Sequence, residues 1–211
     1  HEIVKRLDYK PNLAGRSLVN KQKNWKVGCI IVKANNPFYD DLCMGLEERI
    51  SQYETYGLQT VLTHVPFDAA AQCEAIDAFV TQGINALIIQ PVDEISVRYK
   101  LMELMSKNIL VVTVNTTLPD FSPFCYIGND FYVCGKIAAN LLELVTGGVC
   151  KIGIVTGNFN AQSHYSRIRG FQEYSKNHPQ MEIVEIVENK DDEFISFERT
   201  KQMLLDHPEI D

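Results

Sequence analysis

The sequence lacks the patterns that mark several large classes of protein. No apolar run approaches the roughly 20 residues that a membrane-spanning helix needs. The charged N-terminal stretch has no apolar core of the kind found in secretory signals. Six cysteines are scattered without a C-x-x-C pair. Scattered thiols suit a reducing cytosol better than a disulfide framework, and we expect no metal site.

Motifs for nucleotide binding and catalysis are also missing. No G-x-G-x-x-G follows the first apolar strand, and neither G-x-x-x-x-G-K-[ST] nor G-x-S-x-G occurs. His64 and His164 stand isolated in the sequence, with no pattern that pairs either with a nucleophile. We therefore expect no cofactor and no enzymatic activity. An enzyme that works in a cleft is the third alternative considered below.

Charge is unevenly distributed along the 211 residues, whose net charge is −7. Residues 1–26 hold seven basic and two acidic residues, which gives +5, while the remainder holds 13 basic and 25 acidic residues, which gives −12. An acidic body repels nucleic acid, but a basic arm attached to it can bind phosphates with salt-sensitive affinity. Composition alone favours the plainer interpretation of this arm as a solvated tail.

Strands and helices alternate from residue 27 onward, which predicts right-handed βαβ units and an α/β fold with doubly wound parallel sheets. Apolar runs such as VGCIIV are typical of strands that are covered on both faces. Strands are predicted over residues 27–32, 58–64, 85–91, 109–115, 124–128, 150–157 and 181–188. Helices are predicted over residues 37–55, 68–82, 94–107, 129–148, 161–177 and 194–207.

The paired glycines Gly147 and Gly148 are the best candidate for a boundary between two lobes. This predicts an N-terminal segment over residues 1–25, a first lobe over residues 26–147 and a partial second lobe over residues 148–211. Two strands are too few for a stable open sheet. We therefore expect that the C-terminal part of the second lobe is absent from this sequence.

Polar and aromatic side chains follow the predicted strands at their carboxyl ends, where open α/β sheets bind ligands. The candidate ligand-binding residues are Asn36, Phe38, Tyr39, Asn115, Asp130 and Arg167. Amides, a carboxylate and an arginine beside aromatic rings suit a polyhydroxylated ligand.

Several of these residues have an alternative structural role. Asn36 can equally serve only as a helix N-cap, and the helical spacing of Phe38 favours the core. Asp130 can act only as a favourable charge at a helix N-terminus, and Arg167 can be a solvated helix residue.

Several short motifs together carry a resemblance to a known family. YKPNLAGRSL (residues 9–18) is similar to the junction between the helix-turn-helix headpiece and the effector domain in the LacI/GalR family of bacterial transcription factors. HEIVKRLDYKPN, IGNDFYVCGKIAANLL and SRIRGF resemble further stretches of that family in the same order. NNPFY is close to the ribose-type periplasmic sugar-binding proteins. The resemblance implies a two-lobed effector domain of periplasmic-binding-protein type I.

The resemblance also implies a role for the basic arm as a hinge helix that forms on operator DNA. Asn12 would cap this helix, Arg16 would meet a phosphate, and Leu18 would enter the minor groove and separate a base step. Gly15 stands where the family usually has alanine, which costs about 1 kcal/mol of helix propensity. The motif matches also assign the six candidate residues above to ligand binding.

We predict from these observations a cytoplasmic, sugar-responsive regulator of transcription that acts as a repressor and a homodimer. A small sugar between the lobes would change the affinity for operator DNA. The alternative is a periplasmic or extracellular sugar-binding protein of an ABC transporter, which shares the fold and the NNPFY signature. The junction motif and the scattered cysteines favour the regulator.

Overall fold

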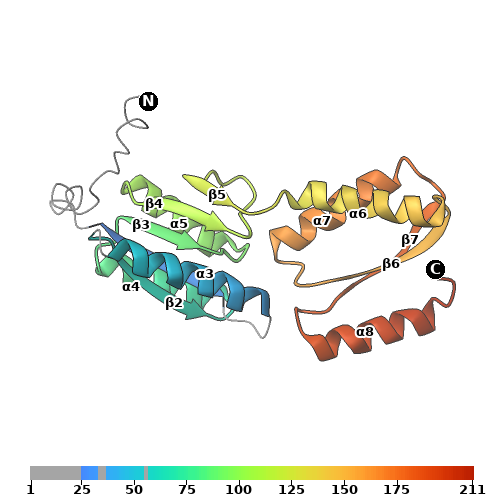
Figure 1. Cartoon of the computed structure of the whole chain (residues 1–211), viewed down its shortest axis with the longest axis horizontal. Helices are drawn as coiled ribbons and strands as arrows, with labels where there is room; N and C mark the ends of the chain where they lie inside the picture. Colours follow the sequence, from blue (N-terminus) through green and yellow to red (C-terminus); the bar gives the residue numbers. More distant parts are fainter. Residues whose placement is uncertain (1–24, 33–36, 55–56) are drawn as a thin grey trace, which may run out of the picture.

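The computed structural model describes residues 25–32, 37–54 and 57–211. Within these ranges the chain forms two α/β lobes built on parallel strands (Figure 1), which confirms the predicted fold class. Every described strand and helix lies within two residues of its predicted range. The hinge residues Asn12, Arg16 and Leu18, and the site residue Asn36, lie outside the described residues.

The first lobe is a five-stranded sheet in the order β2-β1-β3-β4-β5, with every neighbouring pair parallel. Its strands are β1 (Lys26–Val32), β2 (Gln59–Val65), β3 (Ala86–Ile89), β4 (Leu110–Val114) and β5 (Cys125–Ile127). Its helices are α3 (Pro37–Glu54), α4 (Ala69–Thr81) and α5 (Ile95–Ser106). In β1, Cys29, Ile30 and Ile31 are 0% exposed, which explains why this strand reads as a continuous apolar run.

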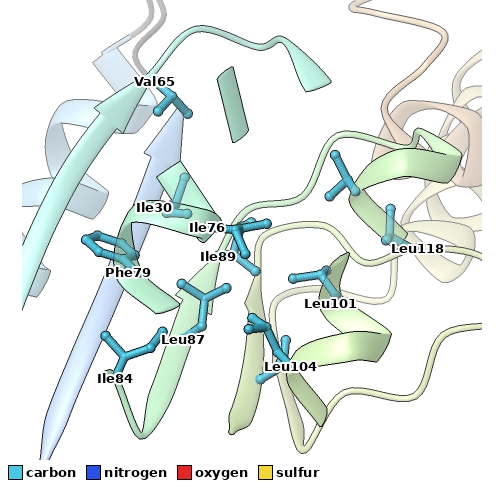
Figure 2. Packing of buried hydrophobic residues seen from close by; sticks show 12 residues of the cluster. Ile30, Val65, Ile76, Phe79, Ile84, Leu87, Ile89, Leu101, Leu104 and Leu118 are labelled. Carbon is cyan, nitrogen blue, oxygen red and sulfur yellow. The ribbon is translucent and has the colours of Figure 1, made fainter. Parts of the chain in front are cut away.

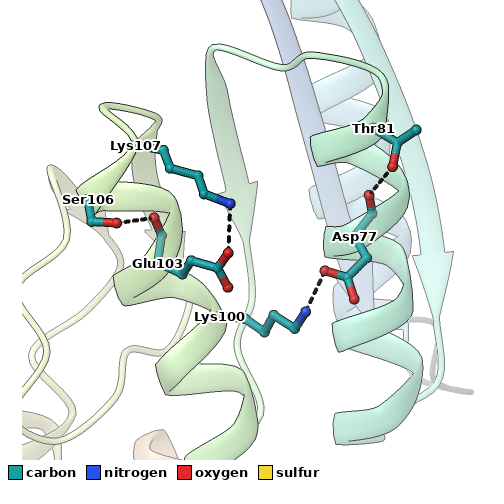
Figure 3. A network of polar contacts seen from close by, with 6 residues as sticks. All are labelled: Asp77, Thr81, Lys100, Glu103, Ser106 and Lys107. Atoms are coloured by element: carbon teal, nitrogen blue, oxygen red, sulfur yellow. Dashed lines mark hydrogen bonds and ion pairs between the residues drawn. The ribbon is translucent and has the colours of Figure 1, made fainter.

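Helices α4 and α5 pack beside each other over the core of this lobe (Figure 2). The Asp68 carboxylate caps α4 by accepting a hydrogen bond from the Ala71 backbone N–H at 2.8 Å. The two helices are also joined at the surface, where Lys100 of α5 forms an ion pair with Asp77 of α4 (Figure 3). The core cluster includes Ile30, Ile76, Phe79, Leu87, Ile89, Leu101 and Leu104.

The second lobe contains two parallel strands and three helices (Figure 1). They are α6 (Phe131–Thr146), β6 (Cys150–Thr156), α7 (Gln162–Ser175), β7 (Met181–Glu188) and α8 (Glu193–Asp206). Its small core joins Cys150, Ile152 and Met181 to partly buried residues that include Phe171 and Tyr174. No helix in the described part of the chain is long and apolar enough to span a membrane.

Helix α6 packs closely against α7, so it lies with the second lobe and not with the first. Glycines make this approach possible, because a Cβ atom at Gly135 would collide with the Arg167 carbonyl and one at Gly170 with the Tyr132 carbonyl. Gly147 adopts φ +69° and ends α6 as a left-handed C-cap. The glycines that were expected to separate two lobes thus mark the end of a helix, and the chain crosses between the lobes ahead of α6.

Candidate ligand-binding cleft

Tyr39, in the first turn of α3, is tied to the carboxyl end of β3. Its hydroxyl accepts a hydrogen bond from Gln90 Nε2 at 3.1 Å. Burial raises the pKa of the Tyr39 phenol, so the hydroxyl stays protonated at neutral pH. Gln90 is 2% exposed, and its Oε1 has no hydrogen-bond partner among the described residues. The end of β3 therefore carries a buried amide oxygen whose hydrogen-bonding capacity is unused among the described residues.

A buried glutamine fixes the segment that carries Gln90. The Gln72 side chain is 0% exposed and projects from α4. Its Nε2 donates to the Gln90 carbonyl at 2.7 Å, and its Oε1 accepts from the Val92 N–H at 3.0 Å. Beyond the end of β3 the backbone has no strand partner for these two groups. The Gln72 side chain therefore supplies both of the hydrogen bonds that a neighbouring strand would otherwise make.

Phe38 does not enter the core, which the helical spacing had favoured. The residue is 49% exposed, and its ring meets the Tyr39 ring edge-on with centroids 5.4 Å apart. The core interpretation of Phe38 was therefore wrong. Helix α3 contacts β1 and β2, and the exposure of Phe38 places its side chain outside that packed face.

Asn115 follows β4 in a left-handed conformation, with φ +60°. Its N–H donates to the Ile127 carbonyl at 2.9 Å. The Tyr126 hydroxyl lies 3.2 Å from the Asn115 carbonyl and 2.9 Å from the Asn129 carbonyl, so it ties the end of β4 to the segment that leaves β5. The Thr117 Oγ1 is buried nearby with no hydrogen-bond partner in the described ranges.

A cavity of about 420 Å³ lies where the chain passes from the first lobe to the second. Its size falls within the range of about 300–1,000 Å³ that is usual for small-molecule sites. Hydroxyl and amide groups dominate its polar lining, which is drawn from both lobes. The lining residues are Thr116, Thr117, Tyr126, Gly128, Asn129, Asp130, Phe131, Tyr132, Gln162, Ser163 and Ser166.

Asp130 lines this cavity and also caps α6, because its Oδ1 accepts a hydrogen bond from the Val133 N–H at 3.0 Å. Its alternative role was that of a favourable charge at a helix N-terminus, and the structure shows Asp130 there as the side-chain cap of α6. The second carboxylate oxygen takes no part in that hydrogen bond. Arg167 of α7 contacts the next residue, Phe131, with its guanidinium 4.2 Å from the ring centroid. Arg167 borders a neighbouring hollow along β6 and not the cavity itself.

The structure also reveals a pair that sequence reasoning missed. His164 is not isolated, because its Nε2 lies 3.6 Å from Asp191 Oδ1. Burial lowers the pKa of His164, Asp191 opposes that shift, and Arg167 adds to it. Asn158, which follows β6, donates to Asp191 Oδ2 at 3.0 Å. A separation of 27 positions in the sequence left no local signal for this contact.

The described residues offer little to metal or nucleophilic chemistry. They contain no group of three or more His, Cys, Asp or Glu side chains that could hold a metal ion. The Cys43 Sγ lies 3.9 Å from His64 Nδ1, but burial, Glu47 and Asp40 raise the pKa of its thiol. A reactive cysteine requires the opposite shift.

Comparisons with known proteins identify similar sequences and folds. The model of a family described as "Periplasmic binding protein domain" matches residues 27–211. The chain is 22% identical over 206 residues to the ribose import binding protein RbsB of Bacillus subtilis, covering 95% of the chain and 64% of that protein. It is 24% identical over 173 residues to catabolite control protein A of Staphylococcus aureus, covering 82% of the chain and 50% of that protein.

Solved structures share the fold. A solute-binding protein of an ABC transporter from Burkholderia graminis, in complex with D-arabinose, superposes with a TM-score of 0.80 at 21% identity, covering 89% of this chain and 64% of that one. The Caulobacter myo-inositol binding protein gives 0.80 at 15% identity, covering 88% and 62%. The chain spans between half and two-thirds of the length of these relatives.

Proposed function

The chain belongs to the periplasmic binding protein domain family, and we propose that it binds a small carbohydrate between its two lobes. The observation that carries this proposal is the cavity of about 420 Å³ at the passage between the lobes, lined by hydroxyls, two amides and a carboxylate. Such groups exchange hydrogen bonds with sugar hydroxyls, while Phe131 and Tyr132 supply apolar ring surface. Relatives named for ribose, D-arabinose and myo-inositol support the same ligand class.

In this proposal the ligand contacts come from several elements. Of the predicted contacts, Asp130 lines this cavity. Tyr39 and Phe38 of α3, Asn115 after β4 and Arg167 of α7 lie outside its lining, so in this proposal they meet the ligand beyond the cavity. Asn36 belongs to the same set through the NNPFY motif. Ligand bound between the lobes stabilises their closed arrangement only to the extent that it contacts both of them.

We further propose that the protein is a cytoplasmic, homodimeric regulator of transcription whose affinity for operator DNA changes with the bound sugar. The junction sequence YKPNLAGRSL supports this role, as does the similarity to catabolite control protein A. Asn12, Arg16 and Leu18 would form the part of the hinge that meets DNA. The coupling is reciprocal, so a sugar that weakens DNA binding is itself bound more weakly by the DNA complex.

The second candidate is the sugar-binding protein of an ABC transporter, which needs no DNA. The NNPFY sequence and the similarity to the ribose import binding protein favour it. The basic arm of residues 1–26 favours the regulator, because a transporter component has no need of phosphate contacts. We propose no enzymatic activity, and turnover of a bound sugar would overturn that statement.

One titration separates the candidates. The whole natural protein is mixed with fluorescently labelled DNA from the region upstream of its own gene, at two salt concentrations, with and without a panel of pentoses and hexoses. We expect saturable, sequence-specific binding that one sugar shifts several-fold. Sugar binding without specific DNA affinity at either salt concentration would instead favour the transport protein.

A further inference from the structure

The Tyr126 hydroxyl lies between two backbone carbonyls, and it has only one proton to donate. Its oxygen is 2.9 Å from the Asn129 carbonyl oxygen and 3.2 Å from the Asn115 carbonyl oxygen. Hydrogen bonds between a hydroxyl and an oxygen usually span about 2.5–3.0 Å, so the contact with Asn129 is the well-formed one. Burial raises the pKa of Tyr126, so the hydroxyl keeps its proton at neutral pH.

The Tyr126 ring and the Asn115 carbonyl both belong to the first lobe. Tyr126 is the middle residue of β5, and β5 pairs with β4 over its whole length. Asn115 directly follows β4, and its N–H donates to the Ile127 carbonyl at 2.9 Å. These contacts fix the hydroxyl and its longer contact to the β5 side of the first sheet.

The Asn129 carbonyl, in contrast, is continuous with the second lobe. Asn129 precedes Asp130, whose Oδ1 caps α6 by accepting a hydrogen bond from the Val133 N–H at 3.0 Å. Helix α6 packs closely against α7, so the first turn of α6 moves with the second lobe. Figure 1 shows the short segment before α6 as the passage from β5 to that lobe. The well-formed hydrogen bond of Tyr126 therefore joins the two lobes.

Gly128 gives the Tyr126 ring the space to reach this carbonyl. A Cβ atom at Gly128 would collide with the Tyr126 hydroxyl, so a residue with a side chain would displace the ring. Tyr126, Gly128 and Asn129 also line the cavity of about 420 Å³. The contact between the lobes and the wall of the cavity thus share the same three residues.

We propose that Tyr126 is a positioning residue that holds the second lobe against the first. Its hydrogen bond to the Asn129 carbonyl stabilises the arrangement seen here, in which residues of both lobes line the cavity. When the second lobe turns away, the hydroxyl keeps only the longer contact to Asn115 within the first lobe. Tyr126 therefore acts on the lobes before any ligand binds. Its effect on ligand affinity rests on the proposed carbohydrate-binding function, whereas its effect on the lobes does not.

Single-molecule Förster transfer on the whole natural protein measures the lobe positions without a ligand. One dye is attached at Glu74 of α4 and one at Glu198 of α8, two exposed positions in different lobes. Keto amino acids carry the dyes, so the native cysteines stay unmodified, and excess unlabelled chain ensures one dye pair in each particle. The wild type is compared with Tyr126→Phe and with the control Tyr99→Phe, which removes the same hydroxyl from an exposed position on α5.

We expect Tyr126→Phe to lower the population of the wild-type transfer peak, relative to other arrangements, about two- to tenfold, because one hydrogen bond is lost. Gly128→Ala keeps the hydroxyl but displaces the ring, so it is expected to shift the peak in the same way. Tyr99→Phe is expected to match the wild type. A wild-type distribution in Tyr126→Phe would overturn the proposal. If Tyr126→Phe does not fold, the distribution of Gly128→Ala decides by the same criterion.

Calorimetric titration with D-ribose, D-arabinose and myo-inositol separates this inference from the proposed function. We expect Tyr126→Phe to bind whichever sugar the wild type binds about two- to tenfold more weakly, and saturating sugar to restore the wild-type transfer peak. Weaker binding with a wild-type distribution before ligand is added would show direct contact with the ligand and overturn the positioning role. An unchanged affinity despite a changed distribution would overturn the effect on binding. A wild type that binds none of the three would contradict the carbohydrate-binding function, while the ligand-free measurement would still decide the role of Tyr126.

Discussion

Asp211 and Lys151 are joined by two hydrogen bonds in opposite directions. The Lys151 N–H donates to Asp211 Oδ2 at 2.8 Å, and the Asp211 N–H donates to the Lys151 carbonyl at 3.2 Å. Asn85 and Lys26 make the same pair in the first lobe, at 2.9 Å and 2.7 Å. In each lobe, therefore, an Asn or Asp side chain pairs with the backbone near the N-terminal end of a strand. Asn85 does so at β1 and Asp211 at β6. The two lobes thus share the same pair of hydrogen bonds at the first strand of each sheet.

Removing the Asp211 acceptor is expected to destabilise the second lobe. In Asp211→Ala the Lys151 N–H loses its side-chain partner, so we expect the free energy of unfolding to fall by about 0.5–1.5 kcal/mol. Urea unfolding followed by circular dichroism measures the change. Asp211→Asn keeps an acceptor oxygen, as Asn85 does, and is the matched control. A loss as large in Asp211→Asn as in Asp211→Ala would show that the hydrogen bond is not responsible.

The contact between α6 and α7 makes a second prediction. In Gly135→Ala the new Cβ would collide with the Arg167 carbonyl and approach the Phe171 backbone N–H. Backbone atoms cannot move aside as a flexible side chain can, so we expect a destabilisation of about 1–3 kcal/mol or more. Thermal unfolding of the purified variant measures it.

Gly45→Ala is the control for that change, because Gly45 also lies within a helix but has nothing within 4 Å of an added Cβ. There we expect a stabilisation of about 0.5–1 kcal/mol from helix propensity alone. If both variants shifted the midpoint in the same direction by similar amounts, close packing at Gly135 would not explain the result.

Local patterns in the sequence predicted the elements well, because periodicity and turn residues act over a few positions. The apolar run of β1 and the acidic charge of Asp130 at the start of α6 are two examples. These local patterns did not predict that α6 packs against α7 in the second lobe. The spacing of apolar residues shows that one face of the helix is buried, but it does not show which lobe buries that face. The sequence analysis interpreted Gly147 and Gly148 as a boundary between lobes. In the structure Gly147 is the left-handed C-cap of α6.

The candidate site was predictable in part for the same reason. The ends of strands can be located from the sequence alone, and three candidate residues come after such ends: Tyr39, Asn115 and Asp130. The pair of His164 and Asp191 depends on two strands being neighbours, and the left-handed backbone at Asp191, with φ +56°, has no sequence signature. Phe38 was misplaced because it fits the apolar spacing of α3 although it lies outside the packed face.

Gln72 is expected to support the ligand site through the backbone that carries Gln90. Gln72→Met keeps the length of the side chain but leaves the Gln90 carbonyl and the Val92 N–H buried without this partner. We expect a loss of about 1–3 kcal/mol in the free energy of unfolding, together with weaker sugar binding. The exposed Gln180 gives the control Gln180→Met, for which we expect a change within about 0.5 kcal/mol. Urea unfolding and calorimetry measure the two effects.

The protonation of His164 gives the last prediction. Its pKa is lowered in the folded protein, so the unfolded chain binds more protons than the native one as the pH falls through and below about 6.5. Stability should therefore decrease from pH 7.5 to pH 5, with a contribution from His164 that is absent in His164→Gln. In Asp191→Asn the group that opposes the shift is gone, so the His164 pKa should fall further. Nuclear magnetic resonance titration of the imidazole measures each value, and a His164 pKa at or above 6.5 in the wild type would contradict the role of burial.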